Sequence, residues 1–539
     1  MPTLRLYNTL TKSIDEFAPI DPAGKLVRFY SCGPTVYDYA HVGNFRAFLN
    51  ADVLRRTLRL VGYDVRHVMN ITDVGHMTDD SGDSGEDRMQ VAARRLSEAK
   101  KSGKLPDGVD LDPGDPYAIA EFYAHAFVED ALTLGLLVAE DAKTHPELMP
   151  RPTRYIPQMI ALVQALIAKG NAYVAKDGVV YFDVRSYPSY GKLSGNTLES
   201  LREGEGGRVA AENQSMKRHP ADFMLWKADP THLMRWPSPW GEGYPGWHLE
   251  CSAMAADLLA APAAGGGDAT GAMIDLHSGG EDNIFPHHEC EIAQSCCGTG
   301  RSLFSRYWFH TRHLIVEGEK MSKSKGNFFT VRDLLAKGAT PAAIRLELIR
   351  THYRVNANFT LQGLKDCQRM IDRWARAAQS LEARLASDPT ARGDGPGVFA
   401  RALPEFTAAL CDDLNVARAV GVLNASVGGA VGELPAEGSR SMGPTSLGSS
   451  ASAGHALRDE LAALQAMNGV LGVLERNAPS DAGAAPDESA RIESLIAARS
   501  AARASKNFAE SDRLRDELLA IGIAIKDGAG GTTWSRVVK

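Results

Sequence analysis

The order of hydrophobic and polar positions near the N-terminus predicts a strand, a helix and a second strand. The apolar run KLVRFYSC at residues 25–32 is typical of a buried strand that ends in a Gly-Pro turn. A helix is expected within residues 37–65, and VRHVMNITDV at residues 65–74 has the pattern of the next strand. Residues 79–115 are rich in Asp, Gly and Ser, so we expect a surface insertion with one helical stretch.

Alternating helix and strand patterns continue beyond this insertion. Residues 155–174 have the pattern of an amphipathic helix that leads into a strand, and residues 271–280 and 307–316 have strand patterns. From Val331 onward the pattern is helical, interrupted by a Gly/Ser-rich segment at residues 426–455 that is typical of a flexible loop. This order predicts an α/β domain with a parallel sheet, followed by a mainly helical region.

Length, charge and cysteine content limit the class of protein. A chain of 539 residues is too long for one hydrophobic core, so several domains are expected. No stretch of about 18 residues is apolar enough to span a bilayer, which predicts a cytoplasmic protein without membrane contact. The net charge of -7 means that nucleic acid would have to bind local basic patches. Seven cysteines without small-scaffold spacing favour metal or thiol chemistry over a disulfide framework.

The segment FPHHECEIAQSCC contains part of a candidate metal site. Pro286 stands where a helix would begin, so His287 and Glu291 would lie one turn apart on one face. If the sheet is doubly wound, Cys32 after the first strand and Cys251 in GWHLECSAM would lie at the carboxyl ends of central strands. The four side chains would then form a Cys₂HisGlu zinc site. Their wide separation in sequence excludes a zinc finger and favours a site at the active cleft.

Two further segments suit phosphate chemistry. His41 to Asn44 open the first predicted helix, where free N–H groups and the macrodipole favour an anion. Taken alone, this segment is better explained by a surface histidine in a capping turn. GEKMSKSKGN carries Lys320, Lys323 and Lys325 on a loop that could close over a triphosphate, although a lysine run alone is usually a solvated surface.

Several segments together resemble one enzyme family. KMSKS resembles the class I aminoacyl-tRNA synthetase signature, and HVGN matches the partner motif His-x-Gly-His at three of four positions, with Asn44 as the exception. Nearly the whole chain resembles the cysteinyl-tRNA synthetases. The matching segments are YNTLT, FYSCGPTVYDYAHVGN, NITDVGH, GWHLECSAM, HSGGEDNIFPHHECE, EKMSKSKGN and NFAESDRLRDELLAIGIAIKDGAGGTTWSR.

This resemblance implies an α/β fold whose catalytic domain is a Rossmann-like, doubly wound parallel sheet with an inserted α/β subdomain. A helical anticodon-binding domain and a small C-terminal α+β unit are expected to follow. The implied domains are 1–135 (first catalytic half, with the 79–115 insertion), 136–220 (connective insertion), 221–330 (second catalytic half with zinc ligands and lysine loop), 331–385 (stem-contact helices), 386–489 (anticodon-binding bundle) and 490–539 (C-terminal tRNA-binding unit).

The resemblance also implies roles for individual residues. One Zn²⁺ per chain would be held by Cys32, Cys251, His287 and Glu291. Substrate cysteine would contact Gly33, Thr72 and Trp247. ATP would contact His41, Gly43, Asn44 and Lys323. Catalysis would involve His41, Lys320 and Lys323. His288 and Cys290 would be supporting residues, and Cys296, Cys297, Cys367 and Cys411 core residues.

The implied partners are L-cysteine, ATP with Mg²⁺, and tRNA-Cys, bound by a monomer. The cysteine carboxylate would attack the α-phosphorus of ATP, and a hydroxyl of the terminal adenosine of tRNA would then attack the adenylate. Zinc would select the substrate, because a thiolate binds it well while a hydroxyl must stay protonated or ionise at a cost. Shape alone rejects serine weakly. The alternative is a structural zinc that joins the two catalytic halves.

The C-terminal segment supports tRNA binding. Residues 491–539 contain nine Lys or Arg against six Asp or Glu, a local excess of positive charge in an acidic chain. Trp534 beside Arg536 could stack on an unpaired base, although without the resemblance a hydrophobic plug over the last helix is the better explanation.

Two other functions remain open from the sequence. The first is the related ligase of mycothiol biosynthesis, which joins activated cysteine to an amino sugar and lacks the anticodon-binding C-terminal region. The second is a zinc-dependent hydrolase that uses His287 and Glu291, which leaves the lysine loop and the basic C-terminal segment unexplained.

Overall fold

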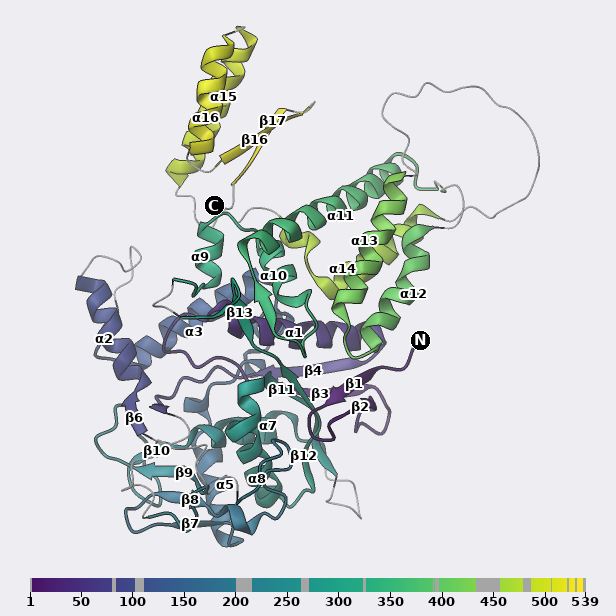
Figure 1. The fold of residues 1–539 in the computed structure, drawn as a ribbon. Coiled ribbons are helices and arrows are strands. Elements are labelled where there is room, and N and C mark those ends of the chain that lie inside the picture. Colours follow the sequence, from purple (N-terminus) through teal and green to yellow (C-terminus); the bar gives the residue numbers. More distant parts are fainter. Residues whose placement is uncertain are drawn as a thin grey trace.

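A four-stranded parallel sheet forms the centre of the catalytic part of the molecule (Figure 1). The computed structural model describes residues 2–79, 84–101, 111–199, 216–262, 271–322, 326–390, 392, 397–432, 456–477, 486–505, 507–520, 523–528 and 531–536. The strands of the sheet are β3 (Leu26–Ser31), β4 (Asp64–Met69), β11 (Ala272–Gly280) and β12 (Leu303–Thr311). Their order is β12-β11-β3-β4 and every neighbouring pair is parallel.

The sheet is doubly wound, as predicted. From β3 the chain proceeds to β4 on one side and later returns to β11 and β12 on the other, so the strand order reverses between β3 and β11. Helix α1 (Val42–Leu60) joins β3 to β4, while α7 (Trp247–Leu259) and α8 (Glu289–Thr299) contact each other and cover strands of the sheet. Neighbouring residues of β3 face different cores: Phe29 packs in the cluster around α1 and Tyr30 in the cluster around α7. Folds of this kind bind ligands at such a switch point, beyond the carboxyl ends of the strands.

An antiparallel sheet is inserted between the two halves of the catalytic domain. It contains β7 (Ala172–Val174), β8 (Val180–Phe182), β9 (Phe223–Ala228) and β10 (Gly243–Pro245), in the order β10-β9-β8-β7. The inserted sheet therefore extends to Pro245, beyond the boundary expected at residue 220. Its core side packs on α5 (Ile156–Ala168) and on α8, which joins the insertion to the catalytic core.

The segment expected to be a surface insertion at residues 79–115 contributes to the core in its described part. Here β6 (Ser84–Asp87), which pairs with β5 (Met77–Asp79), leads into α2 (Arg88–Lys101). Met89 and Ala92 of α2 are fully buried in the main hydrophobic cluster. The sequence pattern did not reveal the burial of this helix, because the flanking Asp, Gly and Ser residues dominate the composition of the segment.

The other elements of this half are β1 (Arg5–Asn8), β2 (Ser13–Glu16), α3 (Pro116–Thr133) and α4 (Leu137–Ala142).

The region after residue 313 begins with a small sheet and becomes helical. β13 (Leu314–Val316) pairs with β14 (Glu319–Lys320) and with β15 (Ala357–Phe359). The helices are α9 (Val331–Ala336), α10 (Pro341–Ile349), α11 (Leu361–Ser387), α12 (Val398–Cys411), α13 (Val416–Gly432) and α14 (Leu457–Leu471). Helix α13 continues into the loop predicted from residue 426, and residues 433–455 lie outside the described part of the chain.

A small α+β unit ends the chain, as expected. It consists of α15 (Pro486–Ala504), α16 (Phe508–Ala520), β16 (Ile523–Gly528) and β17 (Gly531–Arg536), with its own core around Ile492, Leu518 and Ile523 (Figure 1). Trp534 lies in β17 opposite Ile525, but its side chain is outside the described part, so its stacking role stays a prediction. Among the described helices, none has the length and apolar character needed to cross a membrane.

Candidate metal and substrate site

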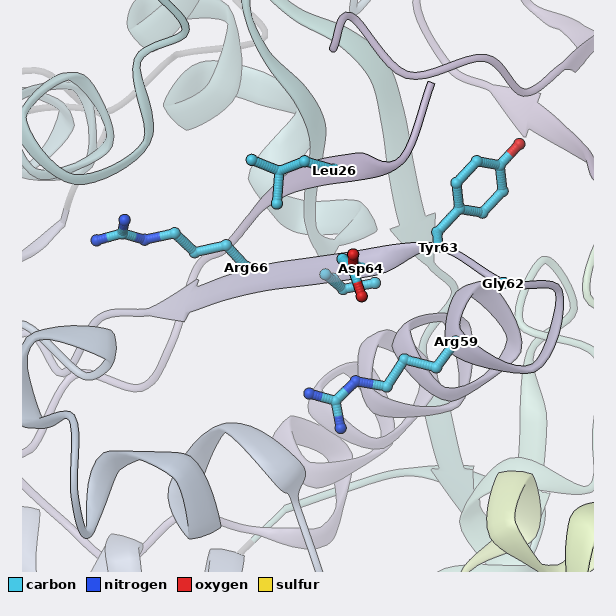
Figure 2. Close-up of a pocket in the computed structure, with 7 residues that line it drawn as sticks. Leu26, Arg59, Gly62, Tyr63, Asp64 and Arg66 are labelled. Carbon is cyan, nitrogen blue, oxygen red and sulfur yellow. The ribbon is translucent and has the colours of Figure 1, made fainter. Parts of the chain in front are cut away.

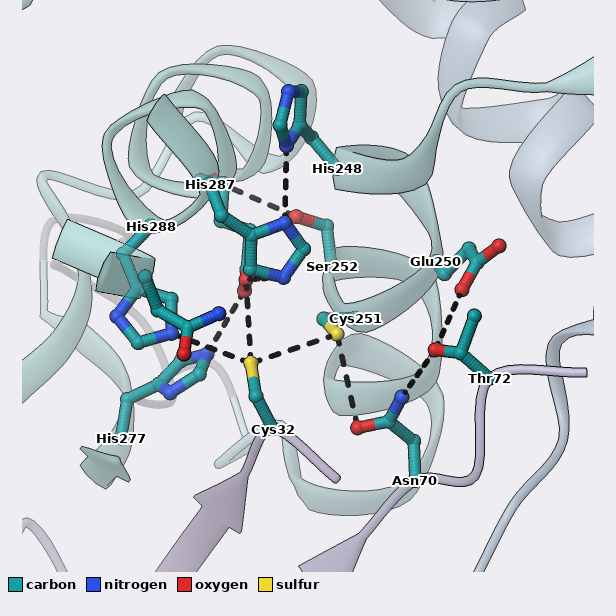
Figure 3. A network of polar contacts seen from close by, with 12 residues as sticks. Cys32, Asn70, Thr72, His248, Glu250, Cys251, Ser252, His277, His287 and His288 are labelled. Atoms are coloured by element: carbon teal, nitrogen blue, oxygen red, sulfur yellow. Dashed lines mark hydrogen bonds and ion pairs between the residues drawn. The ribbon is translucent and has the colours of Figure 1, made fainter. Parts of the chain in front are cut away.

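The switch point between β3 and β11 brings the four predicted metal ligands together (Figure 3). Cys32 directly follows β3, and its backbone N–H donates to the Ser278 carbonyl oxygen of β11 (3.0 Å). Cys251 lies in α7 and not at the carboxyl end of a central strand, so that part of the prediction was wrong; the helix brings its thiol to the same edge of the sheet. Glu291 comes from the first turn of α8. His287 comes from a π-helical turn, Ile284–His288, that precedes α8. The α-helix proper thus begins later than Pro286, because Phe285 has an extended backbone (φ -140°, ψ 136°).

The donor atoms are close enough to bind one ion. They all lie within 4.8 Å of one another. Cys32 Sγ is 3.8 Å from Cys251 Sγ and 3.8 Å from Glu291 Oε1, and His287 Nε2 is 2.9 Å from the same oxygen. Two sulfur atoms bound to a tetrahedral zinc at about 2.3 Å lie about 3.8 Å apart. The distances and the donor types therefore fit a zinc ion.

The charges of these groups also favour a cation. Burial opposes ionisation of Glu291, but the neighbouring His277 and His287 outweigh it and lower the pKa of this carboxyl to about 2. Burial likewise opposes ionisation of Cys251, yet hydrogen bonding with Cys32 and His287 lowers the pKa of its thiol to about 7. Burial raises the pKa of Cys32, and the adjacent Cys251 adds to this effect. A carboxylate and a readily ionised thiol thus share one buried space.

Two further histidines orient the predicted ligands, and the sequence did not identify either of them. His277 Nε2 lies 2.8 Å from Glu291 Oε2, so the other carboxylate oxygen, Oε1, is directed toward the donor set. His248 Nδ1 lies 3.0 Å from His287 Nδ1. Burial lowers the pKa of His248 well below its usual value, so this ring is neutral. Burial also opposes protonation of His287, but Glu291 outweighs it and raises the pKa of His287 to about 10, so both nitrogens of His287 carry hydrogen and Nδ1 donates to His248. A zinc ion would replace the hydrogen on Nε2 and leave this supporting hydrogen bond in place, an arrangement that is common around zinc.

A second group of donors overlaps the first. Cys32, His277, His288 and Glu291 also have ligand atoms within 4.8 Å of one another. His288, predicted to be a supporting residue, places Nε2 3.2 Å from Cys32 Sγ. Because the two groups share Cys32 and Glu291, they can hold only one ion at a time. The group with two thiols better matches the preference of zinc for soft ligands.

The residues predicted to contact cysteine lie beside the donor set. Trp247 stacks on His287, with ring centroids 4.0 Å apart and planes at 24°. A Cβ on Gly33 would lie 1.7 Å from the Asn70 carbonyl oxygen, so only glycine fits after Cys32. Thr72 is buried and is connected to the donor set through the Asn70 side chain (Figure 3).

Three polar residues of this pocket were missed in the sequence, namely Asn70, His76 and Glu250. Asn70 Nδ2 donates to Thr72 Oγ1 (2.9 Å), and Thr72 Oγ1 donates to Glu250 Oε2 (3.1 Å). Glu250 Oε1 is 2.6 Å from His76 Nε2. Their signals were present in NITDVGH and GWHLECSAM, where polar residues stand in otherwise apolar surroundings.

The start of α1 is a capped helix N-terminus. His41 caps the helix: its Nδ1 accepts from the Asn44 N–H (3.2 Å), and Asn44 Oδ1 accepts from the His41 N–H (3.1 Å). The N–H of Val42 donates to the Phe329 carbonyl oxygen (3.0 Å). These backbone amides are therefore engaged within the protein rather than free for an anion. Asn44, which replaces the second signature histidine, acts as a helix cap.

The lysine loop approaches the same helix start. A Cβ on Gly43 would lie 2.6 Å from Met321 Cε and 2.9 Å from ring atoms of His41, so this glycine allows close contact between the loop and the helix. Lys320 is exposed at the end of β14. Lys323 lies outside the described residues, and its role stays a prediction.

The other cysteines and the surface hollow drawn in Figure 2 do not extend this site. All seven cysteines are free thiols. Cys290 is buried against Tyr190, whose hydroxyl is 3.4 Å from its sulfur. A surface hollow of about 490 Å³ lies near the amino ends of β3 and β4, at the edge of the sheet opposite the metal ligands (Figure 2). Its lining residues are Leu26, Arg59, Gly62, Tyr63, Asp64, Val65 and Arg66.

Comparison with known proteins agrees with the geometry. Residues 19–369 match the family model of the class I (C) tRNA synthetase catalytic domain, and residues 485–534 match the cysteinyl-tRNA ligase anticodon binding domain. The cysteine–tRNA ligase of Salinibacter ruber is 42% identical and the alignment covers 99% of this chain and 98% of that protein. The cysteine–tRNA ligase of Symbiobacterium thermophilum is 41% identical, with 99% of each chain covered.

A solved structure shows the same fold at low sequence identity. The Mycobacterium tuberculosis methionyl-tRNA synthetase bound to methionyl-adenylate has a TM-score of 0.51 and 14% identity, covering 86% of this chain and 95% of that chain. The similarity in sequence to the curated relatives is far higher and extends over both matched domains. The chain therefore belongs to the cysteine–tRNA ligases, a family of class I aminoacyl-tRNA synthetases.

Proposed function

We propose that this enzyme activates L-cysteine with ATP, transfers it to the terminal adenosine of tRNA-Cys, and selects the substrate thiol with one bound zinc ion. The observation that carries the proposal is the convergence of two thiols, an imidazole and a carboxylate at the switch point of the sheet. Cys32, Cys251, His287 and Glu291 would hold the metal. When bound, zinc would supply a Lewis acid that prefers a thiolate to a hydroxyl.

The protein's own side chains would position the other parts of the substrate. Trp247, stacked on His287, would limit the space beside the donor set, and Thr72 would provide a hydroxyl at the opposite side. His41, at the start of α1, would lie near the phosphates of ATP with Gly43, and Lys320 and Lys323 would neutralise charge during the transfer. No side chain is required as a nucleophile, because the substrate carboxylate attacks the α-phosphorus itself.

The parts of the chain after residue 330 would bind tRNA. The match to an anticodon binding domain at residues 485–534 falls on the small C-terminal unit. We propose that α11 and the helical bundle at residues 386–489 contact tRNA as well, that Mg²⁺ accompanies ATP, and that the enzyme acts as a cytoplasmic monomer. The alternative ligase of mycothiol biosynthesis lacks such a C-terminal unit.

Metal analysis combined with charging assays tests this proposal. We expect one zinc per chain, loss of cysteine-dependent pyrophosphate exchange after chelation, and its recovery when zinc is added. Charging of tRNA-Cys and no ligation of cysteine to an amino sugar are expected in parallel. Full activity of the metal-free enzyme would contradict the role of zinc, and amino-sugar ligation without tRNA charging would contradict the main function.

A further inference from the structure

A fully buried carboxylate lies next to the donor set without being a metal ligand. Glu250 is in the first turn of α7, immediately before Cys251, and its side chain is 0% exposed. Both of its oxygens have a partner: Oε1 is 2.6 Å from His76 Nε2. Oε2 is 3.1 Å from Thr72 Oγ1, and Figure 3 shows this second contact. Burial raises the pKa of Glu250 well above its usual value, and an ionisable group is costly to bury, so its presence here requires an explanation.

The backbone determines the direction of each hydrogen bond in this network. The N–H of Gly33 can only donate, and it donates to Asn70 Oδ1 (2.9 Å). The oxygen of the Asn70 amide therefore faces Gly33, and its NH₂ group faces Thr72. Since that NH₂ group can only donate, Thr72 Oγ1 accepts there (2.9 Å) and must send its own hydrogen elsewhere.

Glu250 Oε2 receives the hydrogen of the Thr72 hydroxyl. The short contact of 2.6 Å between Glu250 Oε1 and His76 Nε2 holds the proton that these two groups share, so Oε2 has no hydrogen of its own and can only accept. A hydroxyl has one hydrogen and two lone pairs, so Thr72 retains one lone pair after it has bound Asn70 and Glu250. Among the residues that the structure describes, no other hydrogen-bond partner of Thr72 Oγ1 is found.

We infer that Glu250 is a positioning residue that makes Thr72 a hydrogen-bond acceptor for the α-ammonium group of the substrate, and thereby makes the pocket select an amino acid rather than any thiol. The inference rests on the proposed function. An ammonium group can only donate, so a Thr72 hydroxyl whose hydrogen pointed toward it would repel it. Asn70 contacts both Thr72 and Cys251, whose sulfur is 3.8 Å from Asn70 Oδ1. The ammonium side and the thiol side of the pocket are thus positioned by one amide.

The test compares cysteine with 3-mercaptopropionate, which has the thiol and the carboxylate but no ammonium group. Glu250→Met removes the acceptor at similar volume, Glu250→Gln retains the shape, and Thr72→Val removes the hydroxyl. The KM for cysteine is measured by pyrophosphate exchange with the full-length zinc-loaded enzyme, and 3-mercaptopropionate is measured as a competitive inhibitor. Glu460→Met is the matched control, because Glu460 is an equally buried carboxylate in the helical bundle, where it accepts from two backbone N–H groups.

We expect Glu250→Met to raise the KM for cysteine by at least about tenfold, the loss typical of a hydrogen bond to a charged group. Inhibition by 3-mercaptopropionate should change by less than about twofold, as should both values in Glu460→Met. Glu250→Gln should keep the KM for cysteine within about twofold of the wild-type value, because its amide oxygen can accept from Thr72 while its NH₂ group donates to His76. The double variant with Thr72→Val should be no worse than Thr72→Val alone, because Glu250 acts through Thr72.

Other outcomes overturn the inference. Equal losses for cysteine and 3-mercaptopropionate would show general damage to the pocket. Additive losses in the double variant of Glu250→Met and Thr72→Val would show that Glu250 does not act through Thr72, and an unchanged KM for cysteine in Glu250→Met would remove its role. If Glu250→Met fails to fold, Glu250→Leu, which also lacks an acceptor, takes its place in the same comparison. A wild-type enzyme without cysteine-dependent exchange would instead contradict the proposed function itself.

Discussion

The support that His277 gives to Glu291 leads to a quantitative prediction about metal affinity. Both side chains are completely buried, and His277 Nε2 lies 2.8 Å from Glu291 Oε2. His277 also stacks on Trp308 with ring centroids 4.7 Å apart and planes at 14°. Substitution of His277 by Phe keeps the ring against Trp308 but removes the hydrogen bond, so the Glu291 carboxylate is no longer held in one orientation.

The expected cost is about 1.5 to 3 kcal/mol, the typical contribution of a hydrogen bond to a charged group. This corresponds to a loss of zinc affinity of about 10- to 100-fold, the range found when groups that orient metal ligands are removed. Competition with a chromophoric chelator measures the zinc affinity. Pyrophosphate exchange with cysteine should fall at limiting zinc and recover at excess zinc, because the four ligands themselves remain.

A matched variant separates this effect from loss of stability. His67 is also a buried histidine of the central sheet: it stacks on Phe29, and its Nε2 is 2.7 Å from Ser31 Oγ, but it is not one of the donor groups. His67→Phe should lower the free energy of unfolding without changing zinc affinity. Unchanged affinity in His277→Phe, or an equal decrease in His67→Phe, would refute the reasoning.

Three further predictions concern other parts of the molecule. Cys251→Ser should abolish cysteine-dependent pyrophosphate exchange while ATP binding, measured by equilibrium dialysis, persists; normal exchange would exclude Cys251 from thiol selection. Gly43→Ala should slow exchange by up to about 100-fold with little change in Tm, because the new Cβ would displace the Met321 side chain or the helix start; an unchanged rate would show that this contact is dispensable. Asp52→Asn should lower the free energy of unfolding by about 3 to 5 kcal/mol in urea titrations, because it leaves the buried Arg345 without its carboxylate. Burial opposes ionisation of Asp52, but Arg56 and Arg345 outweigh it and lower the pKa of this carboxyl in the folded protein. The stabilisation by Asp52 is therefore present above the unfolded pKa of about 4 and is lost as the pH falls below that value. The Asp52→Asn variant should lack this part of the acid sensitivity, and a pH profile of stability identical to that of the wild type would contradict the assignment.

The donor set could be predicted from the sequence because few residue types bind zinc and strand ends have a defined position. Cys32 follows a recognisable strand, and His287 and Glu291 are one turn apart, so topology brings them to one edge of the sheet. The doubly wound arrangement was predictable for the same reason: the alternation of strand and helix patterns leaves few right-handed topologies.

The supporting residues could not be predicted in this way. Thr72 and Glu250 are separated by 178 positions, and their hydrogen bond depends on the rotamers of both side chains. Local pattern identifies neither the partner nor the direction of such a bond. The extent of the inserted sheet is not a local property either, because pairing of β8 with β9 joins segments that are distant in sequence. Residue type indicated the metal, but only three-dimensional contacts reveal which groups orient its ligands.

Helix α1 connects the predicted ATP site to the helical bundle. Its first residues contact the segment after the lysine loop, since the Val42 N–H donates to the Phe329 carbonyl oxygen. Farther along, Arg56 donates to the Gly469 carbonyl oxygen of α14 (2.8 Å) and to Asp52 (2.7 Å). A helix of this length spans about 28 Å. Asp52 also pairs with the buried Arg345 of α10, which donates to the Leu471 carbonyl oxygen of α14. The bundle therefore cannot shift against α1 without breaking the contacts of Arg56 and Arg345, so the position of the His41 end is linked mechanically to the part of the enzyme proposed to bind tRNA.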